Sequence, residues 1–309
     1  MNKGYIKIAL ALLSVTGYMQ NIAFASETAV ATNSSNVEVN QISADTEGVK
    51  QQLSAPPKKA KQQLNLRSKQ QKCSDPEEAK QAADVMAEAL NVAKKHAEHT
   101  DDYEVHYAGN GAILHFKPLK YASMGKLVFT IPNADSYADI VKMLWNQNAE
   151  KKLNDAFIRG TISRMYNKNL AIIQQRYQGP IWTTYYNALA NKVELSEDET
   201  AIVLVSSNMN DHNLSKGLNY INPIVKSANS FKPDVNSESD IRIGLLHKAY
   251  INLMAIFIKK EANGVKITQL TSIEHAYLPY SPDPKQTLRD MTATIMLNTT
   301  KIGDIIKKE

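Results

Sequence analysis

Two amphipathic helical segments bracket a long run of strand-like segments between Asp75 and Lys307. The first begins at Asp75-Pro76, where an aspartate can cap a helix and a proline suits the first helical position. Alanine, methionine and leucine then recur at helical spacing for about 25 residues. The second helix follows Pro282-Asp283-Pro284 and carries leucine, methionine and isoleucine at similar spacing up to Ile306. This arrangement predicts an α+β domain over residues 75–309.

The segments between the two helices are short, rich in β-branched and aromatic residues, and separated by turn residues. Three strands come first, with a tight turn at Gly109-Asn110, and helices are expected at 135–145 and 149–156. A polar loop of about 30 residues, 208–240, interrupts the later strands. Those later strands are expected near 157–166, 170–177, 185–193, 200–207, 242–259 and 265–273. We therefore predict a curved antiparallel sheet held against a C-terminal helix, the helix-grip architecture.

Apolar side chains fill both faces of the strand expected at 242–259, including Ile251, Leu253 and Met254. One explanation is a hydrophobic tunnel between the sheet and the last helix, and the other is a plain core with helices on both sides. Two acyl chains carry on the order of 30 methylenes at about 0.8 kcal/mol each, so leaving a bilayer costs roughly 24 kcal/mol. A lipid carrier must replace that burial with a dry cavity. We favour the tunnel.

The first 25 residues have the parts of a cleavable signal peptide. Lys3 and Lys7 precede an apolar run at 8–15, and Ala23-Phe24-Ala25 has the small-residue pattern of a cleavage site. Residues 26–74 are polar and then basic, which is typical of a disordered linker. We expect a secreted protein with this linker before its domain. The alternatives are an N-terminal amphipathic anchor, and a basic tract that binds anionic headgroups instead of staying solvated.

Charge and cysteine content narrow the possible partners. The net charge of +5 becomes +3 when the two signal-peptide lysines are removed, which is too small for a nucleic-acid protein. Cys73 is the single cysteine, so an internal disulfide is excluded and the stability must come from a sizeable core. We expect a monomer that binds no nucleic acid.

Catalytic patterns are weak in this chain. Neither His96 and His99 nor the pair Asp211-His212 has a third partner at metal-ligand spacing. The sequence carries no nucleophile elbow, phosphate-binding loop or dinucleotide fingerprint. We therefore expect a non-catalytic carrier without a cofactor.

Several sequence blocks are long enough to point to a family. They are IPNADSY at 131–137, MLWN at 143–146, ALANKVELSEDETAIV at 188–203, SSNMNDH at 206–212, SANSFKPD at 227–234 and FIKKE at 257–261. In these blocks the chain resembles the fam-a multigene family of rodent malaria parasites, which carries a START-like (steroidogenic acute regulatory protein-related lipid transfer) domain. The resemblance implies a hydrophobic tunnel gated by the C-terminal helix. It also implies transfer of phospholipid, phosphatidylcholine in particular, by transient contact with membranes, and export to the parasitophorous vacuole or the host erythrocyte.

Candidate headgroup residues are an arginine and a set of aromatic rings. An arginine can hold a phosphate bidentately, and rings can face a quaternary ammonium. Phosphatidylcholine carriers of the START type use an aromatic cage, but Lys152-Leu153-Asn154 stands where a cage tryptophan would be expected. The expected lipid contacts are Arg176, Trp182, Tyr185, Tyr186, Tyr166, Tyr250 and Met254. The alternatives are that the tyrosines are half-buried sheet residues, and that the chain is an antigenic or protein-binding module that has lost lipid transfer.

Overall fold

The computed structural model describes residues 71–72, 75–179, 182–214, 219–275 and 282–307. The expected signal peptide, and the expected linker apart from residues 71–72, lie outside the described residues. The described strands are β1 (Gln71–Lys72), β2 (Glu104–Gly109), β3 (Ala112–Pro118), β4 (Ser123–Pro132), β5 (Phe157–Asn167), β6 (Leu170–Gln178), β7 (Thr183–Ser196), β8 (Glu199–Val205), β9 (His247–Glu261) and β10 (Gly264–His275). The described helices are α2 (Pro76–Glu98), η1 (Ala134–Ser136), α3 (Tyr137–Trp145), η2 (Ala149–Lys152), η3 (Lys226–Asn229), α4 (Ser239–Arg242), α5 (Pro284–Thr299) and α6 (Ile302–Ile306).

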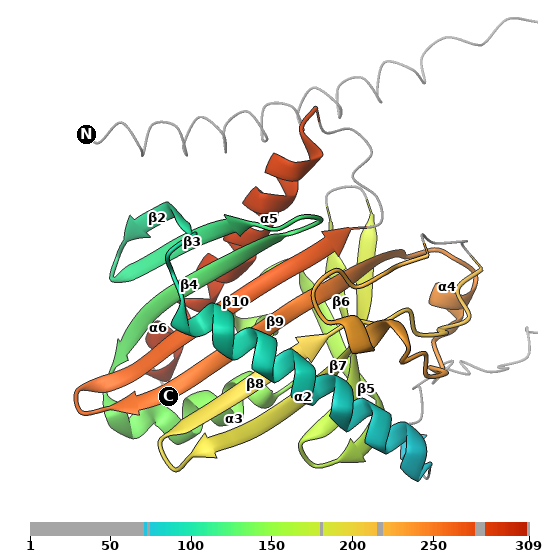
Figure 1. Ribbon diagram of the computed structural model, residues 1–309, viewed down its shortest axis with the longest axis horizontal. Helices are drawn as coiled ribbons and strands as arrows, with labels where there is room; N and C mark the ends of the chain where they lie inside the picture. Colours follow the sequence, from blue (N-terminus) through green and yellow to red (C-terminus); the bar gives the residue numbers. More distant parts are fainter. Residues whose placement is uncertain (1–70, 73–74, 180–181, 215–218, 276–281, 308–309) are drawn as a thin grey trace, which may run out of the picture. The chain divides into compact units, whose positions relative to one another are not determined.

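The described strands form one sheet in the order β1-β5-β6-β7-β8-β9-β10-β4-β3-β2. Neighbours in this order are antiparallel, except that the short β1 runs parallel to β5. Helix α2 crosses one face of the sheet, called here the outer face, while α3, α5 and α6 lie behind the other, inner face (Figure 1). This arrangement confirms the predicted α+β class and the antiparallel sheet with a C-terminal helix against it.

Helix α2 begins where the sequence predicts. The Asp75 carboxylate accepts from the backbone N–H of Glu77 at 2.9 Å, which caps the helix. At the other end, the buried Lys126 amino group donates to the carbonyls of Ala97 at 2.6 Å and His99 at 3.2 Å. A cation there also complements the negative end of the helix dipole. The buried side of α2 is built from Ala82, Val85, Met86, Ala89 and Ala93, and their small average size lets the helix lie close to the sheet.

Two hydrophobic cores result, one on each face of the sheet. On the outer face, α2 and the described residues of the segment 206–246 cover the strands, and Phe231 of that segment is fully buried. On the inner face, α5 packs through Ala293 and Met296 against β4 and β10. A one-residue bulge at Asn252 in β9 places Ile251 in the inner core and Leu253 in the outer core. None of the described helices is both long and apolar enough to cross a membrane.

Several boundaries differ from the sequence-based expectations. The β2–β3 turn is Asn110-Gly111, one residue later than predicted, because both residues adopt the positive φ that such a two-residue turn requires. The last helix is broken into α5 and α6 around Thr300. Strand β9 begins at His247 instead of residue 242, because α4 and a positive-φ Gly244 precede it. The polar loop expected at 208–240 packs on the outer face wherever the structure describes it.

Candidate functional site

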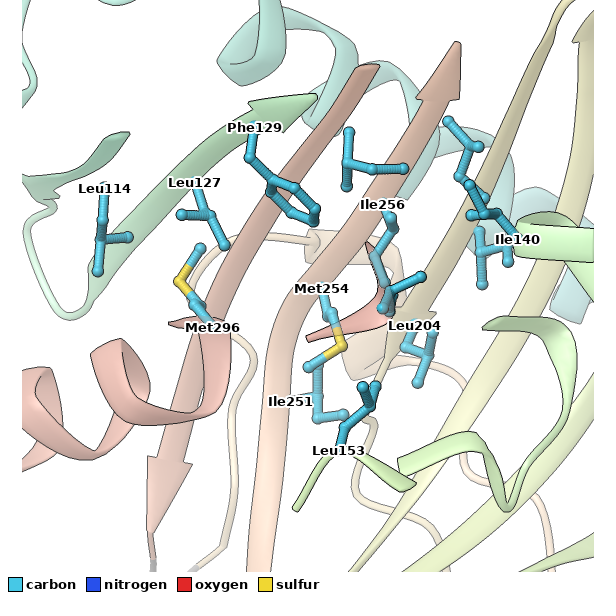
Figure 2. Packing of buried hydrophobic residues seen from close by; sticks show 14 of the residues in the cluster. Leu114, Leu127, Phe129, Ile140, Leu153, Leu204, Ile251, Met254, Ile256 and Met296 are labelled. Atoms are coloured by element: carbon cyan, nitrogen blue, oxygen red, sulfur yellow. The ribbon is translucent and has the colours of Figure 1, made fainter. Parts of the chain in front are cut away.

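A cavity of about 350 Å³ lies between the inner face of the sheet and the elements α3, η2 and α5. Its floor is apolar and is formed by side chains of β6, β8 and β9, including Ile173, Leu204, Met254 and Ile256. Figure 2 shows Leu204 of β8, Met254 and Ile251 of β9 and Leu153 at the end of η2 lying close together. Alternation places Met254 and Ile256 on the same face of the sheet, and the bulge at Asn252 brings Ile251 to that face as well. The cavity can therefore hold an apolar ligand.

Helix α5 supplies one wall of the cavity through Ile295, Asn298 and Thr299. It docks closely on β4 because Gly125 has no side chain. A Cβ at that position would lie 2.5 Å from the Met296 sulfur. Figure 2 shows Met296 of α5 lying beside Leu127 and below Phe129. One wall of the cavity is thus a helix held to the sheet mainly by apolar contacts.

A group of polar side chains borders the cavity near η2. The Glu150 carboxylate accepts from the Tyr177 hydroxyl at 2.8 Å, and the Gln175 amide oxygen accepts from the hydroxyls of Tyr177 and Tyr186. Gln175 in turn donates to the Gln147 carbonyl at 2.7 Å. Burial raises the pKa of Glu150 and favours its neutral form, while hydrogen bonds from Tyr177 and Asn154 act against this. Glu150 and Gln175 line the cavity itself.

Sequence reasoning did not find this polar group. Gln175 and Tyr177 alternate with Ile173 on β6, so all three face the cavity side of the sheet. That alternation is visible in the sequence. The contact of Glu150 with Tyr177 is not visible in the sequence, because it depends on how η2 folds against β6.

Another polar side chain, Gln269 of β10, lines the cavity apart from the Glu150 group and is only 2% exposed. Its amide nitrogen donates to the Thr271 hydroxyl at 3.2 Å. Its amide oxygen has no hydrogen-bond partner among the described residues.

The rim of the cavity is polar and exposed. It includes Lys142 and Asn146 near the end of α3, and Asn167 and Lys168 at the β5–β6 turn. Trp145 of α3 also lines the cavity. Two cations therefore stand at the edge of an apolar cavity, with an indole ring and a carboxyl group among the other lining groups.

Two of the seven predicted lipid contacts are on the cavity side of the sheet. Met254 lines the cavity, and Tyr186 belongs to the inner core and donates to the cavity-lining Gln175. The Tyr186 ring stacks on Tyr177 with centroids 5.9 Å apart.

Four of the predicted contacts lie on the outer face instead. Arg176 follows Gln175 on β6, so its side chain points the opposite way, and it pairs with Asp240 at 2.5 Å and Glu238 at 3.0 Å. The Tyr185 hydroxyl donates to the buried Asp211 carboxylate at 2.8 Å. The structure does not bring these side chains to the cavity.

The other two outer-face residues are Tyr250 and Tyr166, and Trp182 is the seventh predicted contact. Tyr250 stacks on Tyr220 of the segment 206–246, with ring centroids 3.9 Å apart. Tyr166 packs against the outer core, and its hydroxyl donates to Glu78 of α2. Trp182 is 45% exposed beside His247, with ring centroids 4.8 Å apart. The rings expected to form a cage are therefore spread over two faces and one end of the sheet.

Comparison with known proteins places the fold. No protein-family profile matches the sequence, and no curated protein sequence matches it either. Among solved structures, human STARD10 is similar with a TM-score of 0.50 and 14% identity over 71% of this chain and 78% of that one. Human StAR-related lipid transfer protein 5 has a TM-score of 0.50 and 7% identity over 73% of this chain and 98% of that one. The chain has a START-like helix-grip fold.

Proposed function

We propose that this chain binds a lipid in the inner-face cavity and transfers it between membranes without catalysing a reaction. The observation that carries the proposal is the apolar cavity of about 350 Å³ under α5. The fold supports it, since human StAR-related lipid transfer protein 5, by its name a lipid transfer protein, has a similar structure. A lipid leaving a bilayer loses about 0.8 kcal/mol for each methylene that becomes wet, and the floor of this cavity would keep those methylenes dry.

The proposed ligand is a phospholipid with a choline headgroup. A quaternary ammonium is attracted by the face of a tryptophan and would favour the ionised form of a buried glutamate, and the cavity is lined by Trp145 and Glu150. Lys142 and Lys168 on the rim supply positive charge for a phosphate. These four residues replace the outer-face Arg176 as the groups on which headgroup recognition depends.

The direct test is native mass spectrometry of the purified protein, followed by extraction and identification of any bound lipid. We expect a phospholipid in the mass spectrum, and transfer of labelled phosphatidylcholine between vesicles. Ala190→Phe places a ring in the cavity and should abolish both, because Ala190 lines it. A protein that is empty and inactive in transfer before any substitution would contradict the carrier function and favour a binding module that has lost its lipid.

The proposed gate is α5. Cysteines introduced by Gly125→Cys and Met296→Cys, in a Cys73→Ser background, join α5 to β4 at a point of direct contact. We expect the oxidised form to stop transfer and the reduced form to recover it. Equal transfer by the two forms would show that the lipid enters without movement of α5.

The proposed membrane contact is a set of exposed apolar side chains around α4, called here the tip patch. It comprises Trp182, Leu214, Ile243 and Leu245, which are 45%, 76%, 60% and 66% exposed. Leu214 is joined to α4 by a hydrogen bond from its N–H to the Arg242 carbonyl at 2.9 Å. The patch suits a bilayer surface, because tryptophan favours that interface and leucine and isoleucine insert below it.

The proposal includes membership of the fam-a family and secretion toward the host erythrocyte. Both are supported by the sequence blocks between residues 131 and 261 and by the signal-like segment 1–25. Sequencing the N-terminus of the secreted protein tests the second part. Cleavage after Ala25 is expected, and retention of Met1 in the mature protein would contradict it.

A further inference from the structure

Gln269 of β10 has a buried amide on the cavity side of the sheet. This side chain lines the cavity, is 2% exposed, and has an amide oxygen without a hydrogen-bond partner among the described residues. Its nitrogen is held by the Thr271 hydroxyl at 3.2 Å, so the oxygen is the atom left for a ligand. A buried acceptor without a partner is destabilising, and a ligand that donates an O–H or N–H to it would remove that penalty.

Diacyl phosphatidylcholine cannot supply such a donor. Its polar groups are ester oxygens, a phosphate and a quaternary ammonium, none of which carries an N–H or an O–H. A phospholipid that has lost one acyl chain has a free glycerol hydroxyl in its place. That hydroxyl can donate to the Gln269 oxygen.

The cavity also favours the smaller ligand. It measures about 350 Å³, and a lysophospholipid has one acyl chain to enclose where a diacyl lipid has two.

We infer that the cavity is built for a lysophospholipid, a phospholipid with one acyl chain and a free glycerol hydroxyl. The chain lies on the floor formed by Leu204, Met254 and Ile256, and the hydroxyl donates to Gln269 on β10. The phosphate remains at the rim near Lys142 and Lys168. This inference rests on the proposed function and names the class of lipid that the same site selects.

The test compares three ligands on the full chain by calorimetry below their micelle concentrations. They are 1-acyl lysophosphatidylcholine, its 2-O-methyl ether, and a diacyl phosphatidylcholine with the same chain length. We expect the lysophospholipid to bind about tenfold more tightly than the ether, which is the size of one net hydrogen bond. Diacyl phosphatidylcholine should bind more weakly than both.

The matched variant is Gln269→Met, which keeps a similar volume but has no amide oxygen. Because the comparison is made between ligands on one variant, a change in its stability cancels. We expect Gln269→Met to bind the lysophospholipid and its ether equally. If the wild-type chain already binds these two ligands equally, or prefers the diacyl lipid, the inference fails while the carrier function stands. If none of the three ligands binds, the carrier function fails as well.

Discussion

On the outer face of the sheet, the buried Asp211 is joined to the partly buried Lys248 by an ion pair of 2.7 Å, with 4% and 11% of their side chains exposed. On the inner face, Gln269 is equally buried, yet its amide oxygen has no partner among the described residues. Both faces therefore contain deeply buried polar groups, and they differ in whether the protein itself satisfies them. The paired Asp211 helps to hold the described part of the segment 206–246 to the sheet. The Gln269 amide oxygen, which has no partner among the described residues, faces the cavity.

The same contrast explains the position of Arg176. A buried arginine next to predicted aromatic rings suggests a phosphate site, but its guanidinium is already occupied by Asp240 and Glu238. Buried charges are costly unless paired, and a paired charge has little capacity left for a ligand. Pairing, more than residue type, separates structural polar groups from binding groups in this fold.

The largest expected effect comes from breaking the outer-face ion pair. Lys248→Met leaves the Asp211 carboxylate buried without its cation, and we expect the free energy of unfolding to fall by about 3–5 kcal/mol. Denaturant unfolding measures it. The control is Lys117→Met, which removes a pair with the 75% exposed Asp102 and should change the free energy of unfolding far less. Equal losses in the two variants would show that the outer-face pair is not structural.

The next largest effect on stability is expected from enlarging an outer-face alanine, compared with the same change at an inner-face alanine. Ala201 is fully buried in the outer core, so Ala201→Leu should overpack it and cost about 1–3 kcal/mol. Ala190 lines the cavity, so Ala190→Leu should be tolerated within about 1 kcal/mol while weakening lipid binding. Thermal unfolding and lipid titration of both variants check this. A similar destabilisation by Ala190→Leu would show that the inner face has no usable space.

The third effect depends on pH. The pKa of Glu150 is raised in the folded protein above the value of 4.5 that an unperturbed glutamate has, so the folded state binds more protons than the unfolded state in the interval between the two. Stability therefore falls as pH rises through that interval, by about 1.4 kcal/mol for each pH unit it spans. Glu150→Gln should remove this slope, and unfolding curves at several pH values would show it. An unchanged slope would mean that Glu150 is ionised at little cost.

The smallest effect concerns the tip patch. Trp182→Ala combined with Leu245→Ser should slow transfer between vesicles about tenfold, because two exposed apolar side chains no longer insert into the bilayer. Lipid affinity in solution should not change. Val105→Ser, which alters a 63% exposed side chain on β2, is the control and should transfer normally. A loss of solution affinity in the double variant would place Trp182 in the binding site instead.

Much of the fold could be predicted from local signals. Asp75 and Pro76 set the start of α2, and alternating apolar residues located most of the strands. The break between α5 and α6 was missed because Ile302 and Ile306 continue the apolar pattern past it. The start of β9 was missed because Ile243 and Leu245 resemble strand residues, although both are exposed.

The site was harder to predict than the fold. Met254 and Tyr186 lie on the cavity side of the sheet, and their contact with lipid stays a prediction. Alternation along a strand separates its two faces but does not say which face is hollow, and the structure has Arg176 and Tyr185 on the face opposite the cavity. Glu150 approaches Tyr177 only through tertiary packing, which a local pattern cannot show.

Helix α5 follows every strand of the sheet in the chain. During synthesis, the side chains it covers, such as Leu127 and Phe129, stay uncovered until α5 has left the ribosome. A nascent chain that stops before Pro284 thus has all the described strands, but the apolar part of the inner face that α5 covers is still exposed. Such an intermediate is prone to aggregate, and a lipid or chaperone that covers the surface at that moment would protect it.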